Sequence, residues 1–574
     1  MSLKERIYSL ETEYAINFYP SDKAAEKTPA ASTIVQILLH CLVAEYGLPN
    51  CVFLLNGSKF HHDVGHAEWS LPECRTAQEA AIYDKTADYL LSNVIPQTEE
   101  ILAQNGYEGH LLIAKNNVDS AGNTYGCHEN YLMLRDAELL GGEKFLRYLV
   151  RCLIPFLTTR QIFAGTGRVM STDIPFEISQ RASFIELPVS TTTTSERAIV
   201  NLGRENEPLS AGNYRRLHLI VGDANLSGWA TWMKLGTTGI LLRMIEDLFV
   251  VNIPLLRDPV AALQAISRDL STVVPLRDGR AITALDIQWH YYELADTYLE
   301  QFGCSDEEDT LMEAWGKALE DVETEPLSLR NRADWAGKKY LLNKYLENNN
   351  SDWDNLSSSV FTALQAWDLR YHNIGQDGIY AKTWQPDTKV EKAEIAIAAK
   401  QPPQFTRARI RGEVLADAKN NGTEVNVEKW GELVWNRKVY TLGDPLTFYS
   451  PFLPINIYKL LQEEINHADP IIRARIAVFL IEQDNPLLVK LLKKVATQDE
   501  DEQVRRVTIQ ALGNSGNKAT WQDILIQCLP DKNPMVRWTA EWALDNLSQG
   551  KKTVPSPPQM NKSQDEETLV QIIR

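Results

Sequence analysis

Residues 6–18 read RIYSLETEYAINF, and their polar and apolar side chains largely alternate. This alternation predicts a β-strand, because successive side chains of a strand point to opposite faces. Glu11 and Glu13 lie two positions apart, so such a strand places both carboxylates on one face of its sheet. Oxygen ligands on a rigid strand suit Mg²⁺, and the alternative is an ordinary solvated sheet face.

Strand and helix patterns alternate irregularly after this strand. The spacing of apolar residues predicts a helix over 76–104, two strands joined by a polar connection over 111–135, and helices over 139–164 and 229–250. Asn56-Gly57 suits the type I′ turn of a hairpin. We therefore expect a mixed α+β fold rather than a doubly wound parallel sheet.

Length, charge and cysteine content narrow the class of protein. At roughly 100–200 residues per domain, 574 residues allow about three or four domains. A balance of 58 Lys and Arg against 76 Asp and Glu gives a net charge of −18, which argues against a nucleic-acid partner. Seven cysteines without a C-x-x-C pair indicate buried free thiols in a reducing cytoplasm. No stretch has the pattern of a signal peptide or a membrane span, so we expect a cytoplasmic protein without a membrane partner.

A period of 32 residues marks the last quarter of the chain. The segments DPIIRARIAVFL, DEQVRRVTIQAL and NPMVRWTAEWAL start at Asp469, Asp501 and Asn533 and align without gaps. Such a period predicts stacked helix pairs with Asp or Asn as N-cap, because a single pair cannot bury its apolar face alone. The fifth residue of each segment is expected to link neighbouring repeats, and it is always arginine: Arg473, Arg505 and Arg537. The repeats resemble HEAT repeats over 456–548, and a Pro- and Gly-bearing tail over 549–574 is expected to be disordered.

Three further clusters carry residue types that catalysis uses. Residues 61–74, HHDVGHAEWSLPEC, combine three acidic side chains with three histidines. A zinc site is the alternative there, but Gly65 and the strand-like surroundings argue against a helical histidine pair. Residues 115–135 are dense in Asn, Asp, His and Glu, although a polar hairpin would explain them equally well. Residues 213–227 supply a basic pair suited to phosphates or a carboxylate, and a plain surface patch is the alternative.

The order and wording of these segments resemble one known family. The strings LETEYA, NGSKFHHDVGHAEW, KNNVDSAGNTYGCHENYL, YRRLHLIVGDANLS, MKLGTT, ALDIQ and PPQFTRARIRGE are similar to those of the Pup ligase and Pup deamidase family. This family belongs to the glutamine-synthetase-like carboxylate–amine ligases. The resemblance implies a curved, mainly antiparallel sheet forming an open cradle with helices behind it, over 1–400, and a small domain over 401–455. The HEAT-like part lies outside the resemblance.

The resemblance also implies the roles of individual residues. ATP would sit at one end of the cradle, and Mg²⁺ would be held by sheet carboxylates at Glu11, Glu68 and Glu73, to which the strand pattern adds Glu13. Asp63 matches the catalytic aspartate. The expected active-site and nucleotide-binding residues are His128, Glu129, Arg215, Arg216, His218, Arg411 and Trp430.

The implied reaction joins a Pup-like modifier to proteins. A carboxylate is a poor electrophile, so ligases of this kind convert a glutamate side chain into an acyl phosphate with ATP. The attacking lysine, with a reference pKa of about 10.4, must first lose a proton. Asp63 would accept this proton as general base. Besides the modifier and lysine-bearing proteins, the helical repeats are expected to offer a surface for protein partners.

Two other functions remain open on the sequence. The short interval between Glu13 and Asp63 resembles the ligases, but the spacing from Asp63 to Glu68 and the string GDANLSGWATWMKLGTT resemble the deamidases, which hydrolyse the same amide. The segment NLGRENEP, 201–208, also departs from the family pattern, which leaves the modifier unidentified. A catalytically vestigial scaffold built around the repeats is the third possibility. Clustered like charges argue against it, because an idle cradle gains nothing from them.

Overall fold

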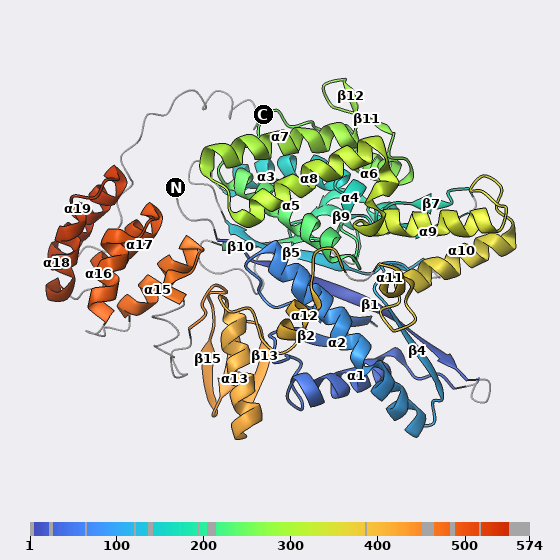
Figure 1. Ribbon diagram of the computed structural model, residues 1–574, viewed down its shortest axis with the longest axis horizontal. Coiled ribbons are helices and arrows are strands. Elements are labelled where there is room, and N and C mark those ends of the chain that lie inside the picture. The colour runs from blue at the N-terminus through green and yellow to red at the C-terminus, as the bar shows by residue number, and fades with distance from the viewer. Residues whose placement is uncertain are drawn as a thin grey trace. The chain divides into compact units, whose positions relative to one another are not determined.

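The computed structural model describes residues 5–21, 27–63, 66–119, 122–135, 142–171, 173–192, 195–203, 214–384, 387–449, 464–482, 488–515 and 518–549. The chain forms two compact units (Figure 1). The larger unit runs from Arg6 to Phe448, and the smaller one contains Glu5 and the described residues from Tyr449 onward.

An eight-stranded sheet organises the larger unit, with the strand order β2-β3-β1-β5-β10-β9-β8 and with β4 also paired to β1. Among the described strand pairs of this sheet, only β8 and β9 run parallel. The predicted α+β class and the mainly antiparallel sheet are therefore confirmed. The strands are β1 (Tyr8–Pro20), β2 (Lys59–Asp63), β3 (His66–Ser70), β4 (Gly109–Ala114), β5 (Cys127–Leu134), β8 (Leu187–Ser190), β9 (Ala198–Asn201) and β10 (Tyr214–Leu219).

The long strand β1 connects several parts of the sheet. Its first residues, Tyr8–Thr12, pair with β5, and its last residues, Ala15–Pro20, pair with β4. Residues 11–14 pair with β3. Both strands predicted within 111–135 are present as β4 and β5, but each pairs with β1 rather than with the other.

One face of the sheet is apolar and covered by helices. Leu10, Tyr14, Trp69 and Tyr131 point to this face and are buried. Helices α2 (Ala77–Gln104) and α5 (Gly228–Glu246) pack against strands of the sheet and against each other (Figure 1). Burial of each large apolar side chain contributes about 1.5–3 kcal/mol. Nearly every residue of α5 is buried, as expected for a helix between two layers.

A second helical layer lies behind α5, where α3 (Gly142–Thr159), α7 (Ala284–Phe302) and α8 (Asp306–Thr324) contact it (Figure 1). Helices α7 and α8 each begin at a side-chain cap, Thr283 and Ser305. Besides these and the helix of the small subdomain below, the described helices of this unit are α1 (Ala31–Tyr46), α4 (Gln161–Ala164), α6 (Pro259–Arg268), α9 (Asp334–Asn348), α10 (Ser358–Tyr371), α11 (Ile379–Thr383), α12 (Lys392–Ala398) and the 3₁₀ turns η1 (Ala182–Phe184) and η2 (Pro326–Asn331).

Smaller sheets complete the larger unit. A three-stranded antiparallel sheet of β13 (Val425–Lys429), β14 (Glu432–Trp435) and β15 (Lys438–Thr441) packs with α13 (Arg407–Asn421). This subdomain lies within the region expected as a small domain, and it belongs to the same compact unit as the large sheet. Its expected limits at 401 and 455 stay predictions. Two-stranded sheets are formed by β6 (Arg168–Val169) with β7 (Phe176–Glu177) and by β11 (Val273–Pro275) with β12 (Ala281–Thr283).

The smaller unit is a stack of helices, as the 32-residue period predicts. Arg473 forms two hydrogen bonds with the carboxylate of Asp499, and Arg505 repeats this contact with Asp531. Asp501 accepts hydrogen bonds from the first backbone amides of its helix, as an N-cap does. Its helices among the described residues are η3 (Glu464–Asn466), α15 (Pro470–Glu482), α16 (Val489–Gln498), α17 (Glu502–Asn514), α18 (Lys518–Cys528) and α19 (Pro534–Gln549).

Close packing of α17 and α19 requires a glycine. A Cβ at Gly513 would lie 2.7 Å from the Cβ of Ala543, closer than such atoms approach in proteins. The amide of Asn546 donates to the carbonyl of Gly513 across the same contact. Apart from Gln549, the last residue of α19, the tail predicted over 549–574 lies outside the described residues.

The described residues bear on the expected lack of a membrane span and on the expected state of the cysteines. No helix among the described residues is both long and apolar enough to cross a lipid bilayer. All seven cysteines are free thiols, and six of them are buried, whereas Cys304 is exposed and departs from the expectation.

Candidate active site

The second face of the large sheet collects ionisable side chains. The strand register pairs Glu11 with both Ser70 and His128, and it pairs Glu13 with Glu68. Directly opposed residues of neighbouring strands share a face. The two glutamates of β1 therefore lie on the same face as Glu68 and His128.

Strands β2 and β10 extend this polar face on both sides. On β2, His61 is opposite Glu68 and Asp63 is opposite His66. On β10, His218 is opposite Asn130, and Arg216 lies two positions earlier, on the same face. The structure thus brings together most of the predicted site residues, on what we call the polar face: Glu11, Glu13, Asp63, Glu68, His128, Arg216 and His218.

Negative charge accumulates at the centre of the polar face. Burial, followed by the charges of Glu11, Asp63 and Glu13, raises the pKa of Glu68 to about 8, although a hydrogen bond from Ser70 opposes the shift. The residue is only 8% exposed. Carboxylates packed this closely repel each other unless a cation joins them.

Basic side chains lie next to Glu11. Burial would raise its pKa, but Arg216 and then His128 and His218 outweigh this effect and hold the pKa below its usual value. The Arg216 guanidinium lies 2.7 Å from a carboxylate oxygen of Glu11, and Nδ1 of His128 lies 3.5 Å from the other oxygen. Glu11 is therefore ionised at neutral pH and available as an anionic ligand.

The polar face contains one compact group that fits a metal ion. Glu11, His128 and His218 each offer a ligand atom, and these atoms lie within 4.8 Å of one another. Sequence reasoning placed the two histidines near the nucleotide, not on the metal. Carboxylate oxygens at Glu11, Glu13 and Glu68 supply the hard ligands that Mg²⁺ prefers, so the residues present fit this ion.

Two residues of β2 were missed by sequence reasoning. Lys59 and His61 share a face with Asp63, because the three alternate along the strand. Nε2 of His61 lies 3.8 Å from Glu68, and burial together with the charge of Lys59 lowers the pKa of His61 to about 4. His61 is therefore neutral at pH 7. The alternation in KFHHD was the signal that could have identified both residues.

Asp63 lies at one end of the polar face. It is exposed at the last position of β2, opposite His66. His66 in turn lies 3.5 Å from Glu13, and its ring packs on Tyr125 at a centroid distance of 4.6 Å. A solvent-borne amine can therefore reach Asp63 without entering the core.

Glu129 and Arg215 were expected in the site, but they face the helices instead. Glu129 is opposite Leu10 and Leu219, is fully buried, and forms a two-pronged ion pair with Arg160 at 2.5 and 2.8 Å. Arg215 donates to the carbonyl of Arg135 at 2.5 Å. Their neighbours His128 and Arg216 occupy the polar face, so the alternation of a strand excludes these two from it.

Glu73 also lies apart from the other carboxylates. It follows β3 and is clamped by two buried arginines of α13, with Nε of Arg407 at 2.6 Å and a second ion pair to Arg411. Burial opposes ionisation, but Arg411 and Arg407 outweigh it and lower the pKa of Glu73 to about 2. The clamp neutralises the charge that a metal ion would otherwise use.

Arg411 connects this clamp to Trp430. It donates to the Trp430 carbonyl at 2.9 Å, and its guanidinium lies 5.0 Å from the centre of the indole ring. Phe53 packs edge-on against the same ring. The clamp adjoins the first residues of β1, because Cys74 bridges to Tyr8, whereas Asp63 is opposite His66, the residue before the partner of Tyr14. We call these two ends of the β1 segment with Glu11 and Glu13 the Trp430 end and the Asp63 end.

Comparison with protein families identifies both parts of the chain. The family model described as Pup-ligase protein matches residues 6–434, and a model for HEAT repeats matches residues 457–545. The chain belongs to the Pup-ligase family. The resemblance noted in the sequence and the HEAT-like repeats are thereby confirmed.

Individual relatives of the Pup-ligase family agree with this assignment. A Pup–protein ligase of Acidimicrobium ferrooxidans is 34% identical over 456 residues, which cover 77% of this chain and 96% of the relative. A Pup–protein ligase of Geodermatophilus obscurus is 35% identical, covering 76% of this chain and 94% of the relative.

Two solved structures are also similar to this chain. A complex between the prokaryotic ubiquitin-like protein Pup and its ligase PafA matches 82% of this chain and 99% of its own, at a TM-score of 0.68 and 30% identity. The Pup ligase PafA in complex with ADP matches 73% of this chain and 91% of its own, at a TM-score of 0.62 and 32% identity.

Proposed function

We propose that this chain is a cytoplasmic, ATP- and Mg²⁺-dependent ligase that joins a glutamate side chain of a Pup-like modifier to lysines of other proteins. The observation that carries the proposal is the polar face, where Glu11, Glu13, Asp63 and Glu68 lie together at an electrostatic cost. An unused surface would not keep such a cost, which argues against a vestigial scaffold. Membership of the Pup-ligase family supports the ligase rather than the deamidase direction.

The order of residues along β1 indicates where each reactant would bind. Trp430 and Arg411 lie beyond Tyr8, Glu11 and Glu13 lie in the middle, and Asp63 lies at the other end. We place the nucleotide at the Trp430 end, and the relative with bound ADP supports a nucleotide site. The modifier carboxylate and the lysine would then meet near Asp63.

The residues of the polar face have two roles in this reaction: most of them bind or balance charge, and Asp63 accepts a proton. Mg²⁺ bound by the carboxylates would screen the phosphates and stabilise the charge that develops during phosphoryl transfer. Arg216 supplies positive charge beside Glu11, and Lys59 adds a second positive charge two strands away, where phosphate oxygens would lie. Glu68 and His61 hold the centre of the face, and a bound cation would return Glu68 to its ionised form.

Bond making follows in two steps. A carboxylate oxygen of the modifier takes the terminal phosphoryl group of ATP, and ADP leaves. The lysine amine then attacks the activated carbonyl carbon, and phosphate leaves with the electrons of the broken carbon–oxygen bond. Asp63 attracts the lysine ammonium and accepts the proton that the nitrogen must lose.

Replacement of Asp63 tests this function. Asp63→Asn is expected to abolish conjugation of a Glu-ended modifier peptide, as seen by mass spectrometry, and to leave Mg²⁺-dependent ATP binding unchanged. His62→Asn is the matched control, because His62 is equally exposed but points to the other face of β2. Full activity of Asp63→Asn would show that the assigned base is wrong.

The products distinguish the ligase from the deamidase. With a Glu-ended peptide, ATP and a lysine-bearing protein, the wild-type chain should give a conjugate and ADP. If instead a Gln-ended peptide loses ammonia and no conjugate forms under any of these conditions, the chain is a deamidase.

The helical repeats have a separate role in this proposal. Stacked helices present an extended surface, and we assign them the recruitment of lysine-bearing proteins. Recruitment by a unit of its own would raise the local concentration of acceptor lysines without changing the catalytic face.

A further inference from the structure

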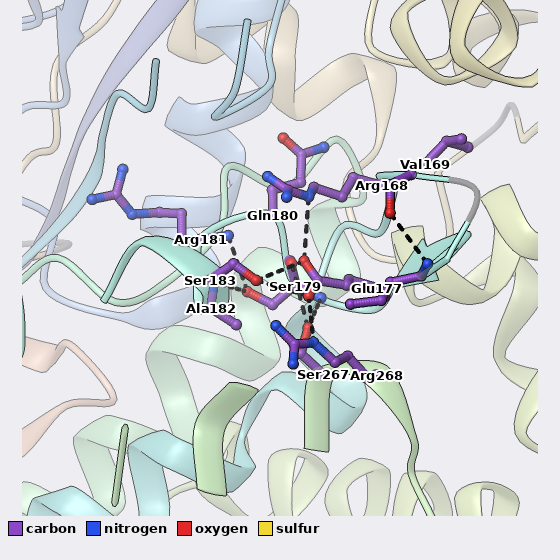
Figure 2. A network of polar contacts seen from close by, with 12 residues as sticks. Arg168, Val169, Glu177, Ser179, Gln180, Arg181, Ala182, Ser183, Ser267 and Arg268 are labelled. Atoms are coloured by element: carbon purple, nitrogen blue, oxygen red, sulfur yellow. Dashed lines mark hydrogen bonds and ion pairs between the residues drawn. The ribbon is translucent and has the colours of Figure 1, made fainter. Parts of the chain in front are cut away.

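Polar contacts fix the segment between β7 and η1 from two sides. Glu177 is fully buried and accepts a hydrogen bond from the Ser183 hydroxyl, which lies 2.7 and 3.0 Å from its two carboxylate oxygens. It also forms ion pairs with Arg168 at 3.3 Å and Arg268 at 3.1 Å (Figure 2). A buried carboxylate with two arginines and a hydroxyl is fully compensated. This network fixes one side of the segment.

Asp223 fixes the other side. Its carboxylate accepts hydrogen bonds from the backbone amides of Gln180 at 3.0 Å and Arg181 at 3.1 Å, and from the Ser179 hydroxyl at 3.0 Å. It also accepts from the amide of Thr166 at 2.9 Å. The backbone of Arg181 is therefore positioned by contacts that leave its side chain free to serve another purpose.

The side chain of Arg181 leaves this network, and Figure 2 shows its guanidinium pointing away from Glu177 and Ser183. The residue is 2% exposed, and the one hydrogen bond of its side chain among the described residues goes from Nη1 to the carbonyl of Tyr125. Its Nε has no partner, and no carboxylate of the described residues forms an ion pair with it. Burial lowers the pKa of Arg181, while the charges of Glu13 and Asp223 act in the opposite direction.

This guanidinium adjoins the Asp63 end of the polar face. Tyr125, which accepts its hydrogen bond, packs on the ring of His66, and His66 is opposite Asp63. The next residue, Gly126, accepts a hydrogen bond from the amide of Glu13 at 3.2 Å. Arg181 therefore lies near Glu13, and the contacts of Tyr125 and His66 link it to the end of the sheet where Asp63 stands.

We propose that Arg181 binds a carboxylate of the modifier glutamate and so selects and positions the group that reacts. This inference rests on the proposed function. A buried cation without an anionic partner is costly, and a ligand carboxylate would supply the missing charge. The planar guanidinium, with its five N–H donors, matches a carboxylate in a fork-like geometry.

The other cations of the face lie elsewhere, which favours the modifier over ATP as the source of this anion. Arg216 contacts Glu11, and Lys59 is opposite Ser70, which in turn is opposite Glu11. Both lie nearer the Trp430 end, where we place the nucleotide. Arg181 is beside Glu13, towards Asp63, where the acyl group and the lysine would meet.

Binding measurements separate this role from a structural one. In the full chain, Arg181→Gln is expected to raise both the Kd of a fluorescent Glu-ended modifier peptide, measured without ATP, and its KM by about ten- to a hundredfold. Arg181→Lys keeps the charge but loses the fork, and should give a smaller rise. The KM for ATP should change by less than about twofold in both variants.

Arg168→Gln is the matched control. Arg168 is a buried arginine of the same network, but it pairs with Glu177 and lies outside the polar face. This variant should lower the melting temperature and leave the peptide Kd unchanged. An equal rise in Kd for Arg168→Gln, or a rise in the KM for ATP alone, would overturn the proposal.

A peptide amidated at its terminal main-chain carboxylate identifies which carboxylate is bound. If the effect of Arg181→Gln disappears with this peptide, Arg181 binds the main-chain carboxylate; if the effect persists, it binds the side-chain carboxylate. Should Arg181→Gln fail to fold, Arg181→Lys decides, and an unchanged peptide Kd in this variant refutes the assignment. Conjugation of the same peptide by the wild-type chain checks the proposed function separately.

Discussion

Among single residues, Glu68 and Glu73 lie only five positions apart in the sequence, but their surroundings shift the pKa values of their carboxyl groups in opposite directions. Glu68 is surrounded by other carboxylates, which with burial raise its pKa to about 8. Glu73 is surrounded by arginines, and its pKa falls to about 2. Glu68 thus needs a cation from solution, whereas Glu73 already has two cations from the protein. The metal role that the resemblance implied for Glu73 remains a prediction, and the structure offers a different role as its alternative.

Substitution of the two glutamates distinguishes these roles. Glu73→Gln is expected to lower the free energy of unfolding by about 3–5 kcal/mol, because it leaves two buried guanidinium groups without their charge partner. Glu68→Gln, the matched control, should leave stability unchanged or increased and weaken Mg²⁺ binding at least about tenfold. Urea unfolding and calorimetric titration with Mg²⁺ measure the two effects. A Glu73→Gln protein of normal stability with weakened Mg²⁺ binding would favour the metal role.

The buried Asp334 at the start of α9 gives the larger unit a pH dependence. Burial raises the pKa of Asp334 to about 6, although hydrogen bonds from Asn225 and Ser227 and the charges of Lys85 and Lys338 oppose the shift. In the unfolded chain an aspartate ionises near pH 4. Between these values the folded state keeps a proton that the unfolded state releases, so this residue's contribution to stability is lost as pH rises through the window.

Asp334→Asn should remove this loss, because asparagine does not ionise. Relative to the wild type, the free energy of unfolding of the variant is expected to rise by about 3 kcal/mol between pH 3.5 and pH 7. Urea unfolding at a series of pH values measures the difference. Asp306→Asn, at the exposed start of α8, controls for the loss of one negative charge. Parallel pH profiles of wild type and Asp334→Asn would contradict the assignment.

Some site residues could be predicted from the sequence and others could not, and the difference depends on whether the local pattern around the residue is regular. The two-residue spacing of Glu11 and Glu13 specified a shared face before any partner strand was known. His128 and Glu129 came together as neighbours in a matching motif, which says nothing about which of them faces the helices. Arg181 stands in an irregular segment without periodicity, so only its three-dimensional surroundings reveal it.

At the scale of helices and strands, local sequence patterns predicted which elements form better than they predicted which strands pair with each other. Helix α2 and the repeat helices match their expected ranges, because apolar periodicity and N-caps act within one element. The pairing of β4 and β5 with β1 depends on contacts across the whole unit, which no local pattern encodes. At Asn56-Gly57, only Gly57 has a positive φ, so the predicted type I′ turn is wrong.

The repeat helices allow a prediction about their own cohesion. Arg505 is almost fully buried, pairs with Asp531 at 2.8 and 3.0 Å, and donates to the carbonyls of Asp499 and Glu500. Arg505→Gln should destabilise the helical unit by about 3 kcal/mol, because Asp531 loses its partner in a buried position. Unfolding followed by circular dichroism should show a lower midpoint for this unit alone.

Arg537 provides the control for this prediction. It occupies the same repeat position, but its hydrogen bonds among the described residues go to the backbone carbonyls of Asp531 and Lys532. Arg537→Gln should therefore cost only about 1 kcal/mol. Equal losses in the two variants would show that the carboxylate contacts of the repeats contribute little.

At the scale of the whole molecule, the chain combines a ligase unit with an additional helical one. The relative from Acidimicrobium ferrooxidans is covered over 96% of its length by an alignment of 456 residues, so little of it remains for a helical array of this kind. The part shared with the family model, residues 6–434, lies within one compact unit that has its own core and the whole polar face. Catalysis and the proposed recruitment are therefore separable in principle.

A chain shortened after Phe448 tests this separation. It retains the larger unit, so it should fold, bind ATP with Mg²⁺, and conjugate a Glu-ended modifier peptide to a short lysine peptide at a rate within about twofold of the full chain. Conjugation to intact proteins should fall at least about tenfold, because the recruiting surface is absent. The full chain with Arg537→Gln, which keeps the repeats folded, should behave as the wild type in both assays. Equal loss of both reactions would mean that the repeats support the catalytic unit itself, and equal retention of both would remove their recruiting role.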